Sequence, residues 1–75
     1  MTEIQRQPVS SSDIASIGYD ATTETLEIEF KATGMYRYFS VPKNVWDELA
    51  RTPSPGKLFL QHIKGKYAWE KIGRV

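Results

Sequence analysis

Aromatic and cationic side chains alternate in the stretch GMYRYFSVP, residues 34–42, where Arg37 lies between Tyr36 and Tyr38 and Phe39 follows. Aromatic rings beside a positive charge can stack on unpaired bases and neutralise phosphates, as in proteins that bind single-stranded nucleic acid. The same rings on a strand can equally form half of a small hydrophobic core. Side chains alternate between the two faces of a strand, so its register decides between a binding surface and a core.

The last third of the chain adds further cations. Residues 55–75 carry five Lys and Arg side chains against Glu70 alone, a net charge of +4, whereas residues 1–54 carry five cations against eight acids, a net charge of −3. Such an asymmetry can mark an anionic partner, although lysines that only solvate a helix and a tail give the same pattern. The candidate nucleic-acid-binding residues are Arg37, Phe39, Lys57, His62, Lys64, Lys66 and Tyr67. The alternative for His62 is a surface position without a binding role. Tyr67 and the neighbouring ring Trp69 can stack on bases or, equally, belong to the core.

Signatures of catalysis and metal binding are weak. The chain has no cysteine and one histidine, which excludes thiol catalysis and a structural zinc site with four Cys or His ligands. No spacing of serine and aspartate around His62 supports a catalytic triad, and PGK at 55–57 lacks the pattern of a phosphate-binding loop. The two carboxylates of EIE, residues 27–29, share one strand face, where we expect one of them to meet Arg37. We therefore expect a non-enzymatic module without a cofactor or a metal ion.

The pattern along the chain predicts an α+β fold. Alternating segments predict three strands, IASIGYD at 14–20, TLEIEFK at 25–31 and MYRYFSV at 35–41, which turns connect into an antiparallel meander. PKNVWDELAR at 42–51 predicts a helix with Val45, Trp46 and Leu49 on one face, and GKLFLQHIK at 56–64 a second, capped by Ser54 and ended by Gly65. KYAWEKI at 66–72 is a possible short C-terminal strand. Two helices then pack on one face of the sheet.

The turn between the second and third strands sets the predicted register. KATGM fits a three-residue hairpin loop with Gly34 in the left-handed region, which places Phe30 opposite Tyr36, Ile28 opposite Tyr38 and Glu29 opposite Arg37. With Asp20 opposite Thr25 in the first hairpin, one face carries Ala15, Ile17, Tyr19, Leu26, Ile28, Phe30, Tyr36 and Tyr38. A rival register with an even-numbered loop would turn both tyrosines outward, and it would also bury Arg37, which is costly.

Length and hydropathy predict one small domain, residues 1–75, with residues 1–8 as a flexible lead-in. No apolar run approaches the roughly 20 residues of a membrane helix, and the polar start MTEIQRQPVS does not fit a signal peptide. We therefore expect a cytoplasmic protein with no membrane partner. Without disulfides or metals the core depends on packing, with self-association as a further source of stability.

Five segments together resemble the KTSC domain family in order and spacing: VSSSDIASIGYD, TLEIEF, GMYRYFSVP, VWDELA and SPGKLFLQHIKGKY. The resemblance covers residues 9–67, which we take as the KTSC-like core. Its motif positions are Ser11, Ser12, Tyr36, Arg37, Tyr38, His62, Lys64, Gly65, Lys66 and Tyr67, and the two prolines of RTPSPGK depart from the family's helix link. The family is named for the C-terminus of some lysyl-tRNA synthetases and includes short bacterial and phage proteins. The resemblance implies a compact α+β module with a nucleic-acid-associated role, and it carries over no catalytic residue.

Two functions of different classes follow from these observations. The first is an accessory module that binds nucleic acid, RNA foremost, through cations and a stacking ring such as Phe39 or Tyr67. The second is a protein-interaction module, in which a partner or a second copy of the chain covers Phe39 on the exposed face of the sheet.

Overall fold

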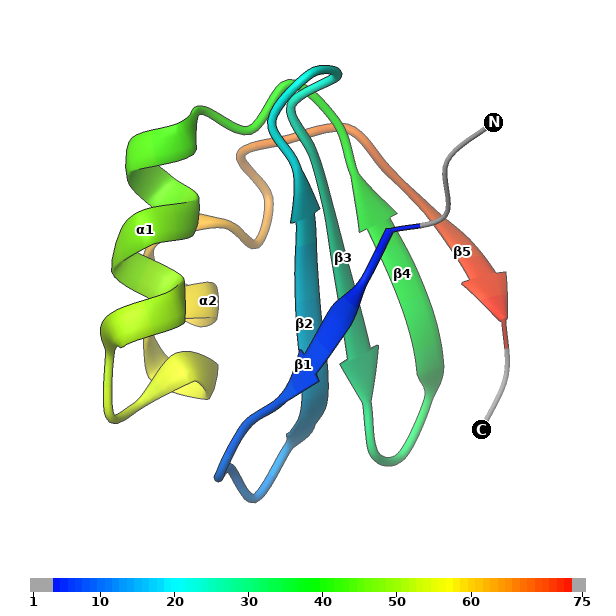
Figure 1. The fold of residues 1–75 in the computed structure, drawn as a ribbon. Helices are drawn as coiled ribbons and strands as arrows, with labels where there is room; N and C mark the ends of the chain where they lie inside the picture. Colours follow the sequence, from blue (N-terminus) through cyan, green and yellow to red (C-terminus); the bar gives the residue numbers. More distant parts are fainter. Residues whose placement is uncertain (1–3, 74–75) are drawn as a thin grey trace.

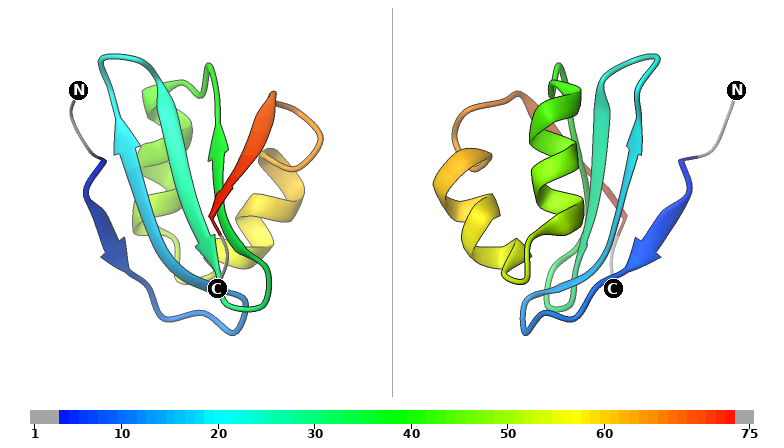
Figure 2. Two further views of the ribbon diagram at one scale, coloured as in Figure 1. Left: turned by 90° about the vertical axis from the view of Figure 1, so that its right-hand side faces the viewer. Right: turned by 60° about the vertical axis from the view of Figure 1, so that its left-hand side comes forward.

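The computed structural model describes residues 4–73 and shows a five-stranded antiparallel sheet with two helices on one of its faces (Figures 1 and 2). The strands follow the chain in the order β1-β2-β3-β4-β5. Their bounds are β1 Arg6–Pro8, β2 Ile14–Asp20, β3 Thr25–Phe30, β4 Gly34–Tyr38 and β5 Trp69–Gly73, and those of the helices are α1 Lys43–Arg51 and α2 Pro55–His62. The predicted α+β class, the meander and both helices are confirmed.

The sheet has one strand more than the sequence predicted, because Arg6–Pro8 pairs with β2 as an edge strand. The strand is three residues long and polar, so it has no apolar alternation to reveal it. Residues 1–3, the start of the expected flexible lead-in, and the basic Arg74 lie outside the described residues. The possible C-terminal strand is present as β5, which pairs with β4 on the other edge.

The predicted faces of the sheet are confirmed except at Ala15, but the pairing of β3 with β4 differs by two residues. The first hairpin pairs Tyr19 with Leu26 as expected. In the second hairpin Phe30 lies opposite Gly34, so the turn is Lys31–Thr33 and Arg37 faces Glu27 instead of Glu29. A shift of two residues keeps every side chain on its face, and therefore alternation alone does not distinguish the two pairings. Gly34 has a φ of 114°, a conformation that suits glycine.

The core lies between the sheet and the two helices. A register shift between Ile14 and Ser16 makes Ala15 the extra residue, so Ile14 and not Ala15 enters the core. The buried apolar residues are Ile14, Ile17, Leu26, Ile28, Tyr38, Val41, Leu49, Phe59 and Ile63. Val45 and Trp46 pack against this cluster beside Leu49, which confirms the predicted face of α1.

Prolines mark the start of both helices, and Ser54 occupies the predicted N-cap position of α2 without a side-chain cap hydrogen bond. Pro42 precedes α1, and Pro55 occupies the first turn of α2, where a missing N–H costs no helical hydrogen bond. The helix α2 ends at His62 with Ile63 as its C-cap, so the predicted cap Gly65 lies two residues further on, in the following turn, with a φ of 79°. In the part of the chain that the structure describes, no helix is long and apolar enough to cross a bilayer.

Candidate ligand groove

Two adjacent pockets form a groove between α2 and the strands β3, β4 and β5. The first pocket, of about 320 Å³, lies between α2 and the turn Lys31–Thr33 and extends to Asp13. The second, of about 310 Å³, extends to Tyr36, Gly65 and Trp69. Phe30, Thr33, Phe59 and Lys64 line both pockets, so the pockets meet at these residues. We call this pair of pockets the aromatic groove.

The floor of the aromatic groove is a chain of rings in contact. Trp69 and Tyr36 have ring centroids 5.5 Å apart, Tyr36 and Phe30 5.6 Å, and Phe30 and Phe59 5.1 Å. Phe59 also contacts the buried Tyr38 at 5.5 Å. Edge and tilted contacts of this kind hold each ring in one orientation. The floor is therefore anchored in the core at Phe59 and exposed to solvent at Trp69.

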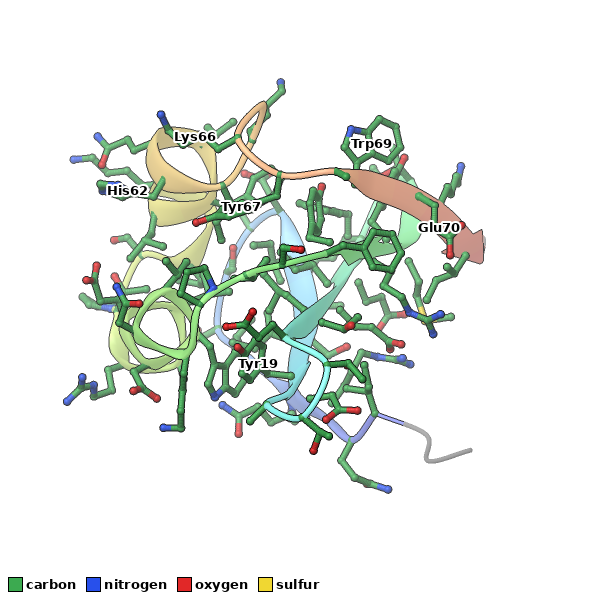
Figure 3. All side chains as sticks on the ribbon, turned by 90° about the horizontal axis from the view of Figure 1, so that it is seen from above. Tyr19, His62, Lys66, Tyr67, Trp69 and Glu70 are labelled. Atoms are coloured by element: carbon green, nitrogen blue, oxygen red, sulfur yellow. The ribbon has the colours of Figure 1, made fainter. Side chains whose placement is uncertain are left out.

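Large apolar side chains are exposed on both sides of the groove. Leu60 on α2 is 59% exposed and lines the first pocket, and Trp69 on β5 is 56% exposed and lines the second. The exposed Leu60 lies off the helix face that buries Phe59 and Ile63. Apolar side chains left in solvent beside a pocket are typical of a surface that contacts a ligand. Figure 3 shows Trp69 pointing away from the body of the protein at the start of β5.

Cations surround the aromatic groove. Lys64 lies where the pockets meet, Lys31 lines the first pocket, and the Nζ atom of Lys71 lies 5.8 Å from the centroid of the Tyr36 ring. The ion pairs found within residues 4–73 join other residues, Arg6 and Arg37 to Glu27 and Lys43 to Asp47. Asp13 is the acidic residue in the lining of the first pocket. The groove therefore combines a largely cationic rim with an aromatic floor.

A third, more polar pocket of about 270 Å³ continues the groove toward the start of α2. It shares Ser12, Asp13 and Gly56 with the first pocket and is also lined by Lys57. The Oγ atom of Ser11 accepts hydrogen bonds from the backbone N–H groups of Asp13, at 3.2 Å, and Ile14, at 3.3 Å. These bonds fix the turn that places Asp13 beside α2, so Ser11 has a local structural role.

The candidate residues from the sequence fall into three places. Lys64 lines both pockets of the aromatic groove, and Lys57 lines the third pocket that continues it. His62 and Lys66 are exposed on the outer side of α2 and the loop after it, and Figure 3 shows both pointing away from Trp69. Tyr67 packs partly buried against the core. Arg37 is on the opposite face of the sheet, and the structure does not bring it together with these lysines.

Arg37 belongs to a row of charges across the open face of the sheet. Arg6, Gly18, Glu27, Arg37 and Glu70 lie opposite one another on successive strands. Glu27 is only 4% exposed and binds both arginines, with its Oε1 atom 2.9 Å from Nη1 of Arg6 and its Oε2 atom 2.7 Å from Nη2 of Arg37. Because of this charge-assisted hydrogen bond, the guanidinium group of Arg37 already has a partner within the protein.

Phe39 lies just beyond the end of β4 and is partly buried. Its backbone N–H donates to the carbonyl oxygen of Ala68 at 2.9 Å, so the segment that leads into β5 runs beside it. The open face therefore presents a compensated set of charges next to a partly covered ring.

The sequence left Trp69 open between a stacking ring and a core residue, and it did not indicate five other residues of the groove as binding residues, namely Phe30, Lys31, Tyr36, Leu60 and Lys71. The sequence did contain one signal for them, since Leu60 lies off the apolar stripe of its helix. Tyr36 illustrates the difficulty, because it is on the core face as predicted but only partly buried. Whether a ring on that face is covered depends on how far α2 extends along the sheet.

Tyr38 lines the second pocket, and its hydroxyl has a shifted pKa. Burial, and to a smaller extent the neighbouring Tyr36, raises the pKa of the Tyr38 hydroxyl to about 12, so this group stays protonated near neutral pH. Within residues 4–73 no group of three His, Asp or Glu side chains lies close enough to hold a metal ion.

Comparisons with known proteins agree with this fold. The sequence model of the KTSC domain family matches residues 10–67. The crystal structure of a KTSC domain protein from Yersinia pestis superposes with a TM-score of 0.92 at 46% identity, and the match covers 95% of this chain and 100% of that one. A lysine–tRNA ligase from Trichormus variabilis is 43% identical over 61 residues, which are 81% of this chain but 11% of the ligase. A protein from Stutzerimonas stutzeri is 36% identical over 64 residues, which are 90% of its length.

Proposed function

This chain belongs to the KTSC domain family, and we propose that it is a non-enzymatic module that binds single-stranded nucleic acid, RNA foremost, in the aromatic groove. The observation that carries the proposal is the position of Lys64, where two aromatic pockets meet. Proteins that bind single strands combine cations that follow the phosphates with rings on which bases stack. The aromatic groove has both, and its exposed Trp69 offers the stacking surface.

RNA is favoured over DNA by the relatives of the chain. Lysine–tRNA ligases, by their name, act on an RNA, and the segment of them that matches this chain is about a tenth of their length. A module of this kind supplies contacts to the nucleic acid while another part of the protein, or another protein, supplies the chemistry. RNA recognition commonly uses unpaired bases stacked on aromatic side chains.

The alternative, a protein-interaction module that docks through the open face of the sheet, has weaker support in the structure. Both arginines on that face are already paired with Glu27, and Phe39 is partly covered. The exposed apolar side chains instead flank the groove on the helix side. Docking of a protein partner therefore becomes one outcome of the tests below.

Reversal of the charge at Lys64 tests the proposal. We expect Lys64→Glu to weaken binding of a short mixed-sequence single-stranded RNA by about tenfold or more at low salt, because a carboxylate would face the phosphates. Fluorescence anisotropy of a labelled RNA measures the change.

The matched control is Lys43→Glu on α1, which changes the net charge equally and disrupts only a surface pair with Asp47. We expect it to change the affinity by about twofold or less. Equal losses in the two variants would contradict a site in the groove and would leave only non-specific attraction.

A further inference from the structure

We propose that the aromatic groove holds two consecutive unpaired nucleotides, one in each pocket, with the phosphate that links them at Lys64. This inference rests on the proposed function and specifies its ligand. The two pockets are nearly equal in volume, at about 320 and 310 Å³, and Phe30, Phe59 and Lys64 line both. A chain that fills both pockets must pass the residues they share, and the cation among those residues is Lys64. A lysine ammonium binds phosphate as a point charge.

The second pocket is the stacking pocket. Its base lies on Trp69, which is exposed, and on Tyr36, whose ring contacts that of Trp69. Stacking accepts every base, because each base has a π-face. Lys71, beside the Tyr36 ring, is placed to meet the phosphate on the outer side of this nucleotide. This pocket therefore contributes affinity without base preference.

The first pocket differs because it contains an acid. Within residues 4–73 the side chain of Asp13 has no hydrogen-bond or ion-pair partner, whereas its backbone is fixed by Ser11 and Lys31. Its Oδ2 atom lies 3.5 Å from the place that a Cβ atom on Gly56 would occupy, so the carboxylate faces α2. A carboxylate repels phosphate, and in a groove for RNA it is tolerated only where it meets a donor.

The donor that Asp13 selects is the exocyclic amine of a base. An ionised carboxylate accepts hydrogen bonds and donates none, and it pairs with the amine of cytosine in nucleic-acid complexes. Uracil offers a carbonyl oxygen at the same position and would face the carboxylate with like polarity. The first pocket therefore prefers cytosine to uracil, and the base preference of the groove depends on Asp13.

Two measurements on the full chain test these points. We expect binding of the dinucleotide CpC, followed by chemical shifts, to move the amides of Ala32 and Leu60 at the first pocket and the Trp69 indole at the second with one common dissociation constant. Cytidine monophosphate should bind at least about tenfold more weakly, because it fills one pocket. Mononucleotide binding as tight as that of CpC, or dinucleotide shifts confined to one pocket, would overturn the two-nucleotide assignment.

The second measurement compares oligo(C) with oligo(U) of eight nucleotides on the wild type and on Asp13→Asn. We expect the wild type to prefer oligo(C) by about fivefold or more, and the variant to lose that preference because an amide both donates and accepts. Because Asp13 is exposed, we expect Asp13→Asn to fold, and an amide spectrum of the free variant confirms it. An unchanged preference in the variant, or no preference in the wild type, would refute the role of Asp13.

The results also separate this inference from the proposed function. The eight-nucleotide RNAs could bind with a strong dependence on Lys64 while CpC binds no more tightly than cytidine monophosphate and oligo(C) no more tightly than oligo(U). In that case the groove binds RNA and the two-pocket assignment is wrong. If no RNA binds, or if Lys64→Glu has no effect, both proposals are wrong. Binding of a protein to the groove in place of RNA would likewise reject both.

Discussion

Glu27 is the best-buried charged side chain described in the structure, and its two arginines organise the open face of the sheet. We expect Glu27→Ala to lower the free energy of unfolding by about 1–3 kcal/mol, because it leaves Arg6 and Arg37 without their partner. Both arginines keep access to water, which places the loss below that of a fully buried pair. Urea denaturation measures it, and Asp47→Ala, which removes an exposed pair on α1, should cost about 0.5 kcal/mol or less. Equal losses in the two variants would show that Glu27 is not a structural anchor.

Because of Tyr38, we expect the free energy of unfolding to depend on pH in the alkaline range. Burial raises the pKa of its hydroxyl from the ordinary value near 10 to about 12 in the folded state, so the unfolded chain releases this proton first. The stabilisation is complete below about pH 10 and falls as the pH rises toward 12, by roughly 2 kcal/mol in total. We expect Tyr38→Phe, which keeps the ring that contacts Phe59, to flatten this part of the curve. Parallel curves for the two proteins, measured by urea denaturation, would contradict the burial of the hydroxyl.

At the scale of elements, β1 depends on the absence of a side chain at Gly18. A Cβ atom there would overlap the backbone oxygen of Gln5 and would lie 2.9 Å from Cγ of Arg6, whose side chain crosses Gly18 to reach Glu27. We expect Gly18→Ala to cost about 1–3 kcal/mol, because backbone must move. Amide hydrogen exchange should become faster in β1 while that of α2 is unchanged.

Gly56→Ala in the first turn of α2 is the matched control. A Cβ atom there meets Asp13 and Ser11 at 3.5 and 3.7 Å, which are ordinary contacts. Alanine suits a helix better than glycine by about 0.5–1 kcal/mol, so this variant should be as stable as the wild type or more so. A Gly18→Ala protein as stable as Gly56→Ala would mean that β1 is not closely packed on β2.

The sequence predicted the elements whose patterns are strong and missed those that arise from contacts between distant segments. Alternation in TLEIEF fixed the faces of the sheet, since a shift of one residue would have buried charge. The sequence could not predict that Arg37 pairs with Glu27, because pairing with Glu29 leaves every side chain on the same face of the sheet. Ile14 replaced Ala15 in the core through a bulge that no local signal marks.

The aromatic groove illustrates the same limit for the site. Lys57 and Lys64 were candidates because of their charge and their places at the two ends of the second helix. The structure places Lys64 in both pockets of the groove and Lys57 in the third pocket that continues it. Trp69 and Leu60 line adjacent pockets of one groove only because β5 returns to pair with β4 beside α2 (Figure 2). The alternation in KYAWEKI predicted a possible strand there, but it did not encode the pairing of that strand with β4 beside α2, which is a tertiary contact.

At the scale of the whole molecule, the charges are divided between two regions. Burial raises the pKa of Tyr19, and the nearby acids Glu24, Asp47 and Asp20 raise it further, which marks a region of negative potential around the β2–β3 turn and α1. Lys31, Lys64 and Lys71 lie around the aromatic groove instead. If the chain binds nucleic acid as we propose, we expect this division of charge to direct the polyanion toward the groove and away from the acidic region.

The most direct test of the central claim is amide chemical-shift mapping of the labelled protein with a short single-stranded RNA at low and at high salt. We predict shifts of the Trp69 indole and of the amides of Thr33, Lys64 and Gly65, which high salt reverses because phosphate contacts release counterions. The amides of Arg37 and Phe39, on the opposite face, should stay in place. Shifts centred on Arg37 and Phe39, or no shift at low salt, would contradict the claim that the groove between α2 and the sheet binds nucleic acid.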